Sequence, residues 1–272
     1  GRPGAEDAHA EALAMTEKLA KEYPDNALYL LELAQCLNTA GATLAGTAPD
    51  KSEAAYLRAL DTLNSEKVAA WSLERLREKA YVLSNLGDLR RSAGKPDAEK
   101  PVLESIGIVE ELVKREPPAR DDLQFLSQAQ ENLAEIYAAN GRDAESLALF
   151  DQSIGREEDL LKGSPESIDD HDLLGYFCDQ KGLLLNKLMK PADARASFEK
   201  AVGYQRSAVK MTDGKVPDYR EKLAGQLEHL AGLCVALSDY EAARKAATEL
   251  ADTGPDLAES HFAAAKVLAL AA

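Results

Sequence analysis

The run Ser167-Ile168-Asp169-Asp170-His171-Asp172 is the part of this sequence where metal chemistry would be argued first. Carboxylate oxygens and an imidazole bind divalent cations, but the run has no ligand spacing that fits a known type of metal site. Serine and aspartate at the start of a helix also cap its free amides and oppose its dipole. We favour capping, and we predict neither a metal nor another cofactor.

Other catalytic signatures are missing from the sequence. It contains no glycine-rich phosphate loop, Cys-x-x-Cys pair, His-Glu-x-x-His, Gly-x-Ser-x-Gly or protein kinase signature, so we predict that the chain is not an enzyme. The three cysteines, Cys36, Cys178 and Cys234, are far apart and odd in number, which argues against disulfides and favours a reducing compartment. We therefore expect a cytoplasmic location, with a membrane anchor outside this sequence left open.

The charge balance limits the class of partner. The chain has 47 acidic and 32 basic residues, a formal net charge of −15. Nucleic acid and anionic membrane surfaces repel such a chain, and no apolar stretch reaches the roughly 18 residues of a membrane span. We expect no nucleic-acid binding and no direct membrane insertion; the acidity indicates either a basic partner or only a solubility requirement.

Five short segments repeat one another along the chain. Their central small residues are Gly41, Gly87, Ala134, Gly182 and Ala231, so that successive spacings are 46, 47, 48 and 49 residues. Two helices approach closely only where no bulky side chain separates them. The spacing predicts an array of helix hairpins, each crossing at one of these residues.

A second signature follows each small residue. In the fourth repeat, Ala194, Phe198 and Ala201 recur at helical spacing and would share one face. The corresponding second-helix segments are 55–60, 97–106, 145–154, 192–202 and 240–250, of which 97–106 is the poorest copy.

At these positions the chain resembles the tetratricopeptide repeat (TPR) family, whose unit is a helix-turn-helix. The resemblance implies an all-α fold, a right-handed α-solenoid of antiparallel helix pairs with about five repeats. The repeats are longer than the usual 34 residues. We expect one continuous domain over residues 1–272, with unpaired helices at Ala5–Glu22 and Leu257–Ala272 that indicate a fragment of a longer protein.

The segments that link the repeats carry a further resemblance. They look like the repeat arrays that follow the catalytic domain in large bacterial serine/threonine protein kinases. This resemblance implies a regulatory or scaffolding region of a bacterial signalling protein, with a kinase domain elsewhere in the same full-length chain.

The TPR resemblance also implies which residues would contact a partner. In the family the first helices line a concave groove at fixed positions around the small residue. Carried over to this chain, those positions predict a partner-binding set of Asn38, Tyr81, Asn85, Asp88, Gln128, Glu131, Asn132, Glu135, Tyr176, Asp179, Gln180 and Glu228.

This lining is rich in amides and carboxylates. Asn85, Asn132 and Gln180 are able to pair with the backbone of an extended peptide, because an amide both donates and accepts. The carboxylates of Asp88, Glu131, Glu135 and Asp179 would select a basic peptide by charge complementarity. We therefore predict a protein-interaction scaffold for a basic segment. The alternative is a structural or self-association module in which the amides form only a solvated face.

Overall fold

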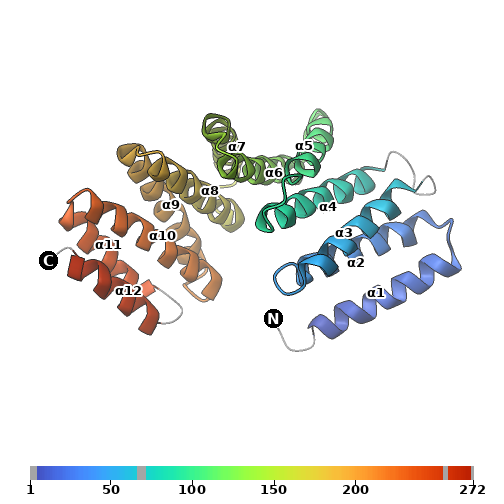
Figure 1. Cartoon of the computed structure of the whole chain (residues 1–272), viewed down its shortest axis with the longest axis horizontal. Helices are drawn as coiled ribbons and strands as arrows, with labels where there is room; N and C mark the ends of the chain where they lie inside the picture. Colours follow the sequence, from blue (N-terminus) through green and yellow to red (C-terminus); the bar gives the residue numbers. More distant parts are fainter. Residues whose placement is uncertain (1–4, 66–71, 254–256, 271–272) are drawn as a thin grey trace. The chain divides into compact units, whose positions relative to one another are not determined.

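The computed structural model describes residues 5–65, 72–253 and 257–270. These ranges contain twelve α-helices and no strand, which confirms the all-α prediction. The chain divides into two compact units, residues 1–140 and 141–272. Figure 1 shows each unit as a succession of helix hairpins.

Unit 1 contains the first six helices, and consecutive helices pack against each other from α1 to α6. α2 also contacts α4, and α4 contacts α6, so that the first helices of successive hairpins lie side by side. The helices are α1 (Ala5–Glu22), α2 (Ala27–Leu44), α3 (Pro49–Asn64), α4 (Leu73–Ser92), α5 (Glu99–Val113) and α6 (Arg120–Ala139).

Unit 2 repeats this arrangement. Consecutive helices pack from α7 to α12, and the first helices α8, α10 and α12 contact one another in sequence. The helices are α7 (Asp143–Gly163), α8 (Ile168–Lys187), α9 (Pro191–Met211), α10 (Pro217–Ala236), α11 (Tyr240–Thr253) and α12 (Leu257–Leu270). The five predicted second-helix segments overlap α3, α5, α7, α9 and α11 in order.

The small residues lie at helix crossings, as predicted. A Cβ added to Gly182 would lie 2.6 Å from two ring atoms of Phe198, and one added to Gly87 would lie 2.2 Å from a methyl group of Val102. A Cβ on Gly41 would lie 2.5 Å from the Tyr56 ring. Since Tyr56, Val102 and Phe198 are almost completely buried, these rings and methyl groups have little room to move aside.

Four first helices end in the same way, seven residues after the small residue. The residues at these positions, Gly94, Gly141, Met189 and Ser238, all have positive φ. After Gly94, Met189 and Ser238 the next amide donates back to a carbonyl five residues earlier, as Lys190 does to Leu185 at 3.0 Å. This is the left-handed cap that commonly ends helices, but only two of the four positions carry the glycine that such a backbone favours.

The boundary between the units follows Asn140, inside the segment that we expected to join the two helices of the third repeat. The prediction of one continuous domain over residues 1–272 stays a prediction.

Candidate functional site

The acidic run at Ser167 caps a helix. α8 begins at Ile168, and the Ser167 hydroxyl accepts a hydrogen bond from the Asp170 amide at 3.3 Å. The Asp172 carboxylate accepts hydrogen bonds from Lys222 at 2.8 Å and from Gln205 at 2.9 Å. Within the part of the chain that the structure describes, no group of three or more histidine, cysteine or acidic side chains is placed to hold a metal.

The predicted amides of unit 1 are tied to neighbouring first helices. Asn85 on α4 donates through Nδ2 to Oδ1 of Asn38 on α2 at 2.9 Å, and Asn38 donates to Glu78 at 2.9 Å. Asn132 on α6 donates to the carbonyl of Ser84 on α4 at 3.1 Å. We call the bonds from Asn85 to Asn38 and from Asn132 to Ser84 the asparagine ladder. The amides that we expected to meet a peptide thus hold successive repeats together.

Unit 2 contains an equivalent bond between its first helices. Nδ1 of His229 on α10 lies 3.0 Å from Oδ1 of Asp179 on α8, and this contact raises the pKa of His229. The three bonds follow one rule. The later residue stands two positions before the small residue of its own repeat, as Asn85 does before Gly87, and its partner stands three positions before the small residue of the preceding repeat. Gln180, two before Gly182, lies half-buried on α8. The sequence contained a signal for these bonds between first helices, because both positions are polar in every repeat.

The predicted carboxylates differ in their exposure. Glu131 and Asp179 are only 6% exposed, whereas the Asp88 side chain is 52% exposed. Arg91 on α4 pairs with Asp88 at 2.5 Å and with Glu135 at 2.8 Å. Burial, reinforced by the neighbouring Glu135 carboxylate, raises the pKa of Glu131 well above its usual range. Burial therefore shifts Glu131 toward its neutral form, and Asp88 is the carboxylate that a partner would reach.

The remaining predicted residues lie on the same first helices. The Tyr81 ring packs on Phe125 with centroids 4.1 Å apart, and burial raises the pKa of Tyr81. Gln128 is half-buried, while Tyr176 and Glu228 are exposed. The partner-binding role of the whole predicted set stays a prediction.

A hollow opens beside the asparagine ladder in unit 1. Its volume is about 340 Å³, and two of the predicted residues, Asn85 and Asp88, contribute to its wall. The other lining residues are Ala42, Ala45, Gly46, Tyr56, Leu89 and Ser92. The sequence predicted the two polar residues but not the hollow, which depends on how the ends of α2 and α4 meet.

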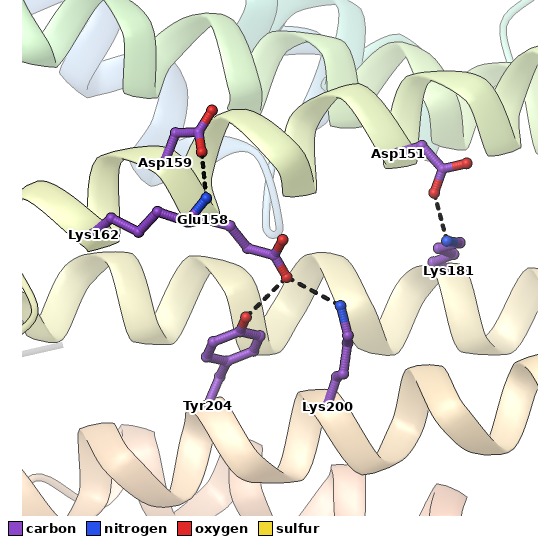
Figure 2. A network of polar contacts seen from close by, with 7 residues as sticks. All are labelled: Asp151, Glu158, Asp159, Lys162, Lys181, Lys200 and Tyr204. Carbon is purple, nitrogen blue, oxygen red and sulfur yellow. Dashed lines mark hydrogen bonds and ion pairs between the residues drawn. The ribbon is translucent and has the colours of Figure 1, made fainter.

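The second helices of unit 2 enclose a different cavity, of about 510 Å³, between α7 and α9. Figure 2 shows polar contacts among these helices: Glu158 accepts from Lys200 at 3.0 Å and from the Tyr204 hydroxyl at 2.9 Å, and Lys181 pairs with Asp151 at 2.5 Å. Cys178 lies at the cavity wall, and burial raises its pKa to about 12, so the thiol stays protonated and unreactive. With these opposite charges paired, the cavity offers no excess charge to a ligand.

Comparisons with known proteins bear on the fold alone. No protein-family model matches the chain, and no curated protein matches it. Among solved structures, BtubC (BKLC) from P. vanneervenii is similar with a TM-score of 0.57 and 20% identity, over 83% of this chain and 85% of that chain. A thermophilic TPR protein of Thermus thermophilus has a TM-score of 0.44 and 18% identity, over 87% and 99% of the two chains. PilW, a type IV pilus biogenesis factor, has a TM-score of 0.46 and 15% identity, over 96% and 89%.

None of the helices that the structure describes combines the length and the apolar character needed to cross a bilayer. The resemblance to kinase-linked repeats stays a prediction. The likeness to BtubC and the hairpins that cross at glycine and alanine agree with the pattern in the sequence: this chain has a TPR-like, all-α fold of antiparallel helix pairs.

Proposed function

We propose that this chain is a non-catalytic protein-interaction scaffold, and that the first-helix surface of unit 1 binds an extended, basic segment of a partner protein. The observation that carries the proposal is the hollow beside Asn85 and Asp88, where an amide and an exposed carboxylate meet an open depression. A bound segment would pass along α2, α4 and α6 and place one side chain in this hollow.

Recognition of a peptide backbone would use the amide oxygens that accept no hydrogen bond within the asparagine ladder. Asn85 uses its Nδ2 toward Asn38, and no described residue donates to its Oδ1. That oxygen is an acceptor for a peptide N–H, and the ladder fixes its position in advance. Because the amide is already ordered, binding would cost little additional side-chain entropy. Asn132 is less suited to this role, since its Oδ1 is buried.

Selection of basic partners would depend on Asp88 more than on the other predicted carboxylates. Asp88 and Glu135 share one guanidinium, that of Arg91, which leaves one negative charge among the three groups. The net charge of −15 supports the same preference at long range, since it raises the encounter rate with a basic chain. In unit 2, Glu228 is the exposed predicted carboxylate and would serve the same purpose.

The test compares two sets of fluorescent decapeptides, one of serine, alanine and lysine and the other of serine, alanine and glutamate. We expect the lysine set to bind more tightly at low salt, and the difference to shrink as salt screens the charges. Asp88→Lys should reduce this preference, whereas Asp61→Lys on α3, an exposed position on a second helix, is the matched control. Equal binding of the two sets would contradict the proposal. Glu131→Lys is unsuitable, because it would bury a second cation beside Arg91.

A second candidate is a structural module without a peptide ligand. The ladder favours it, because amides that bond neighbouring helices have a role without any partner. Failure of both peptide sets to bind, with Asn132→Ala lowering the unfolding midpoint, would favour this alternative.

The setting of the scaffold is a further part of the proposal. The likeness of the link segments to kinase-associated repeats makes the regulatory region of a bacterial signalling kinase one such setting. Detection of a kinase domain encoded in the same reading frame is the direct test.

A further inference from the structure

We propose that the hollow in unit 1 accepts the ε-ammonium group of a lysine side chain from the bound segment. This inference rests on the proposed function and assigns one residue type to one place on the surface.

The shape of the hollow fits an unbranched side chain. Ala42, Ala45 and Gly46 form one wall, and a Cβ added to Gly46 would meet nothing within 4 Å. The Tyr56 ring and Leu89, 2% and 7% exposed, give an apolar surface for the methylene groups of lysine. A volume of about 340 Å³ leaves room for such a chain and for water around its charged end.

The electrostatics favour a cation at this position. The lining includes Ala42 in the last turn of α2 and Ser92 at the end of α4. The last turn of a helix carries a partial negative charge. Asp88 adds an exposed carboxylate on the same wall, of which one oxygen pairs with Arg91.

The acceptors suit lysine better than arginine. Asp88 uses Oδ1 for Arg91, and no described residue donates to its Oδ2. An arginine fork needs both oxygens of a carboxylate to form its two parallel hydrogen bonds. The compact ammonium of lysine needs only single acceptors, which Asp88 Oδ2, Asn85 Oδ1 and the Ser92 hydroxyl supply around the hollow.

The first experiment tests the hollow without a peptide partner. N-acetyl-lysine methylamide is titrated into the ¹⁵N-labelled chain, with the Nε-acetylated form as the uncharged control. We expect the backbone amide signals of residues 42–46 and 85–92 to shift with the lysine probe and not with its acetylated form. Shifts of equal size with both probes, or shifts confined to other residues, would overturn the inference.

The second experiment uses two matched pairs of variants and the lysine decapeptides. Asp88→Asn removes the carboxylate charge at the hollow, and Asp61→Asn removes one from an exposed position on α3. Ala42→Leu fills the hollow, and Thr43→Leu places the same side chain at the next exposed position of α2. We expect Asp88→Asn to weaken binding by up to about fivefold, the upper end of the range for one exposed ion pair, and Ala42→Leu to weaken it by excluding the lysine side chain. Neither control should do so. Arginine decapeptides should bind more weakly than lysine decapeptides.

The outcomes separate the two proposals. If lysine decapeptides bind the wild-type chain in preference to glutamate decapeptides but Asp88→Asn and Ala42→Leu have no effect, the hollow is not the lysine site and the scaffold proposal stands. If the lysine probe shifts the signals of the hollow but decapeptides of both charges bind equally, the hollow stands and the scaffold proposal for basic segments fails.

Discussion

Substitution of Gly182 by alanine tests the close helix crossing that defines the repeat. The added Cβ would lie 2.6 Å from Cδ1 and Cε1 of Phe198, whose side chain is 1% exposed. Alanine is favoured over glycine inside a helix by about 1 kcal/mol, but forcing an extra carbon into a packed core costs about 1–3 kcal/mol. Gly203→Ala on α9 is the matched control, because a Cβ there meets nothing within 4 Å.

We expect Gly203→Ala to stabilise the chain and Gly182→Ala to be about 1–3 kcal/mol less stable than that control. Urea denaturation followed by circular dichroism gives the free energies of unfolding, and hydrogen exchange over α8 and α9 shows whether the loss is local. Phe198→Leu should cost less in the Gly182→Ala background than in the wild type, since the smaller side chain relieves the overlap. Equal stabilisation by both alanine substitutions would refute the close crossing at Gly182.

Three further predictions concern stability. Met189→Gly should raise the free energy of unfolding by about 1 kcal/mol, because Met189 is held at φ 56° and lies exposed where the left-handed backbone favours glycine; an unchanged or lower urea midpoint would contradict this. Since the pKa of His229 is raised in the folded chain by Asp179, the bond between them should stabilise fully below the unfolded pKa and lose its contribution as pH rises through the folded value; His229→Gln should remove this pH dependence from urea midpoints measured between pH 5 and 9. Glu131 acts in the same direction, because burial raises its pKa in the folded chain and its contribution to stability is lost as pH rises above the unfolded pKa; Glu131→Gln should therefore gain stability relative to the wild type between about pH 4 and pH 7, and a constant difference in urea midpoint over this range would contradict the prediction.

The sequence predicted the hairpins and their crossings because these depend on spacing within one repeat. Gly182 and Phe198 belong to the same helix pair, so their contact follows from the pattern alone. Gly94 and Gly141 also indicated where first helices end. Met189 and Ser238, which adopt the same backbone, gave no such signal, since neither residue type favours positive φ.

The predicted site was less accessible to sequence reasoning. Position relative to a small residue indicated which side of a first helix Asn132 and Glu131 occupy, but not how near the preceding helix would lie. That distance places the Asn132 amide on the Ser84 carbonyl and buries Glu131. The three bonds between first helices join residues 47 to 50 apart, so one repeat considered alone does not contain them.

The bonds between first helices also limit the order in which repeats are able to follow one another. In the three bonds described, a first helix presents one polar residue to the first helix before it, and the two residues match as donor and acceptor. A chain in which the fifth repeat followed the first directly would place His229 against Asn38, a pair that forms no charged bond, whereas the present order places it against Asp179. Recombination between repeats of this gene would therefore preserve such bonds only at some junctions, and two residues per repeat identify those junctions.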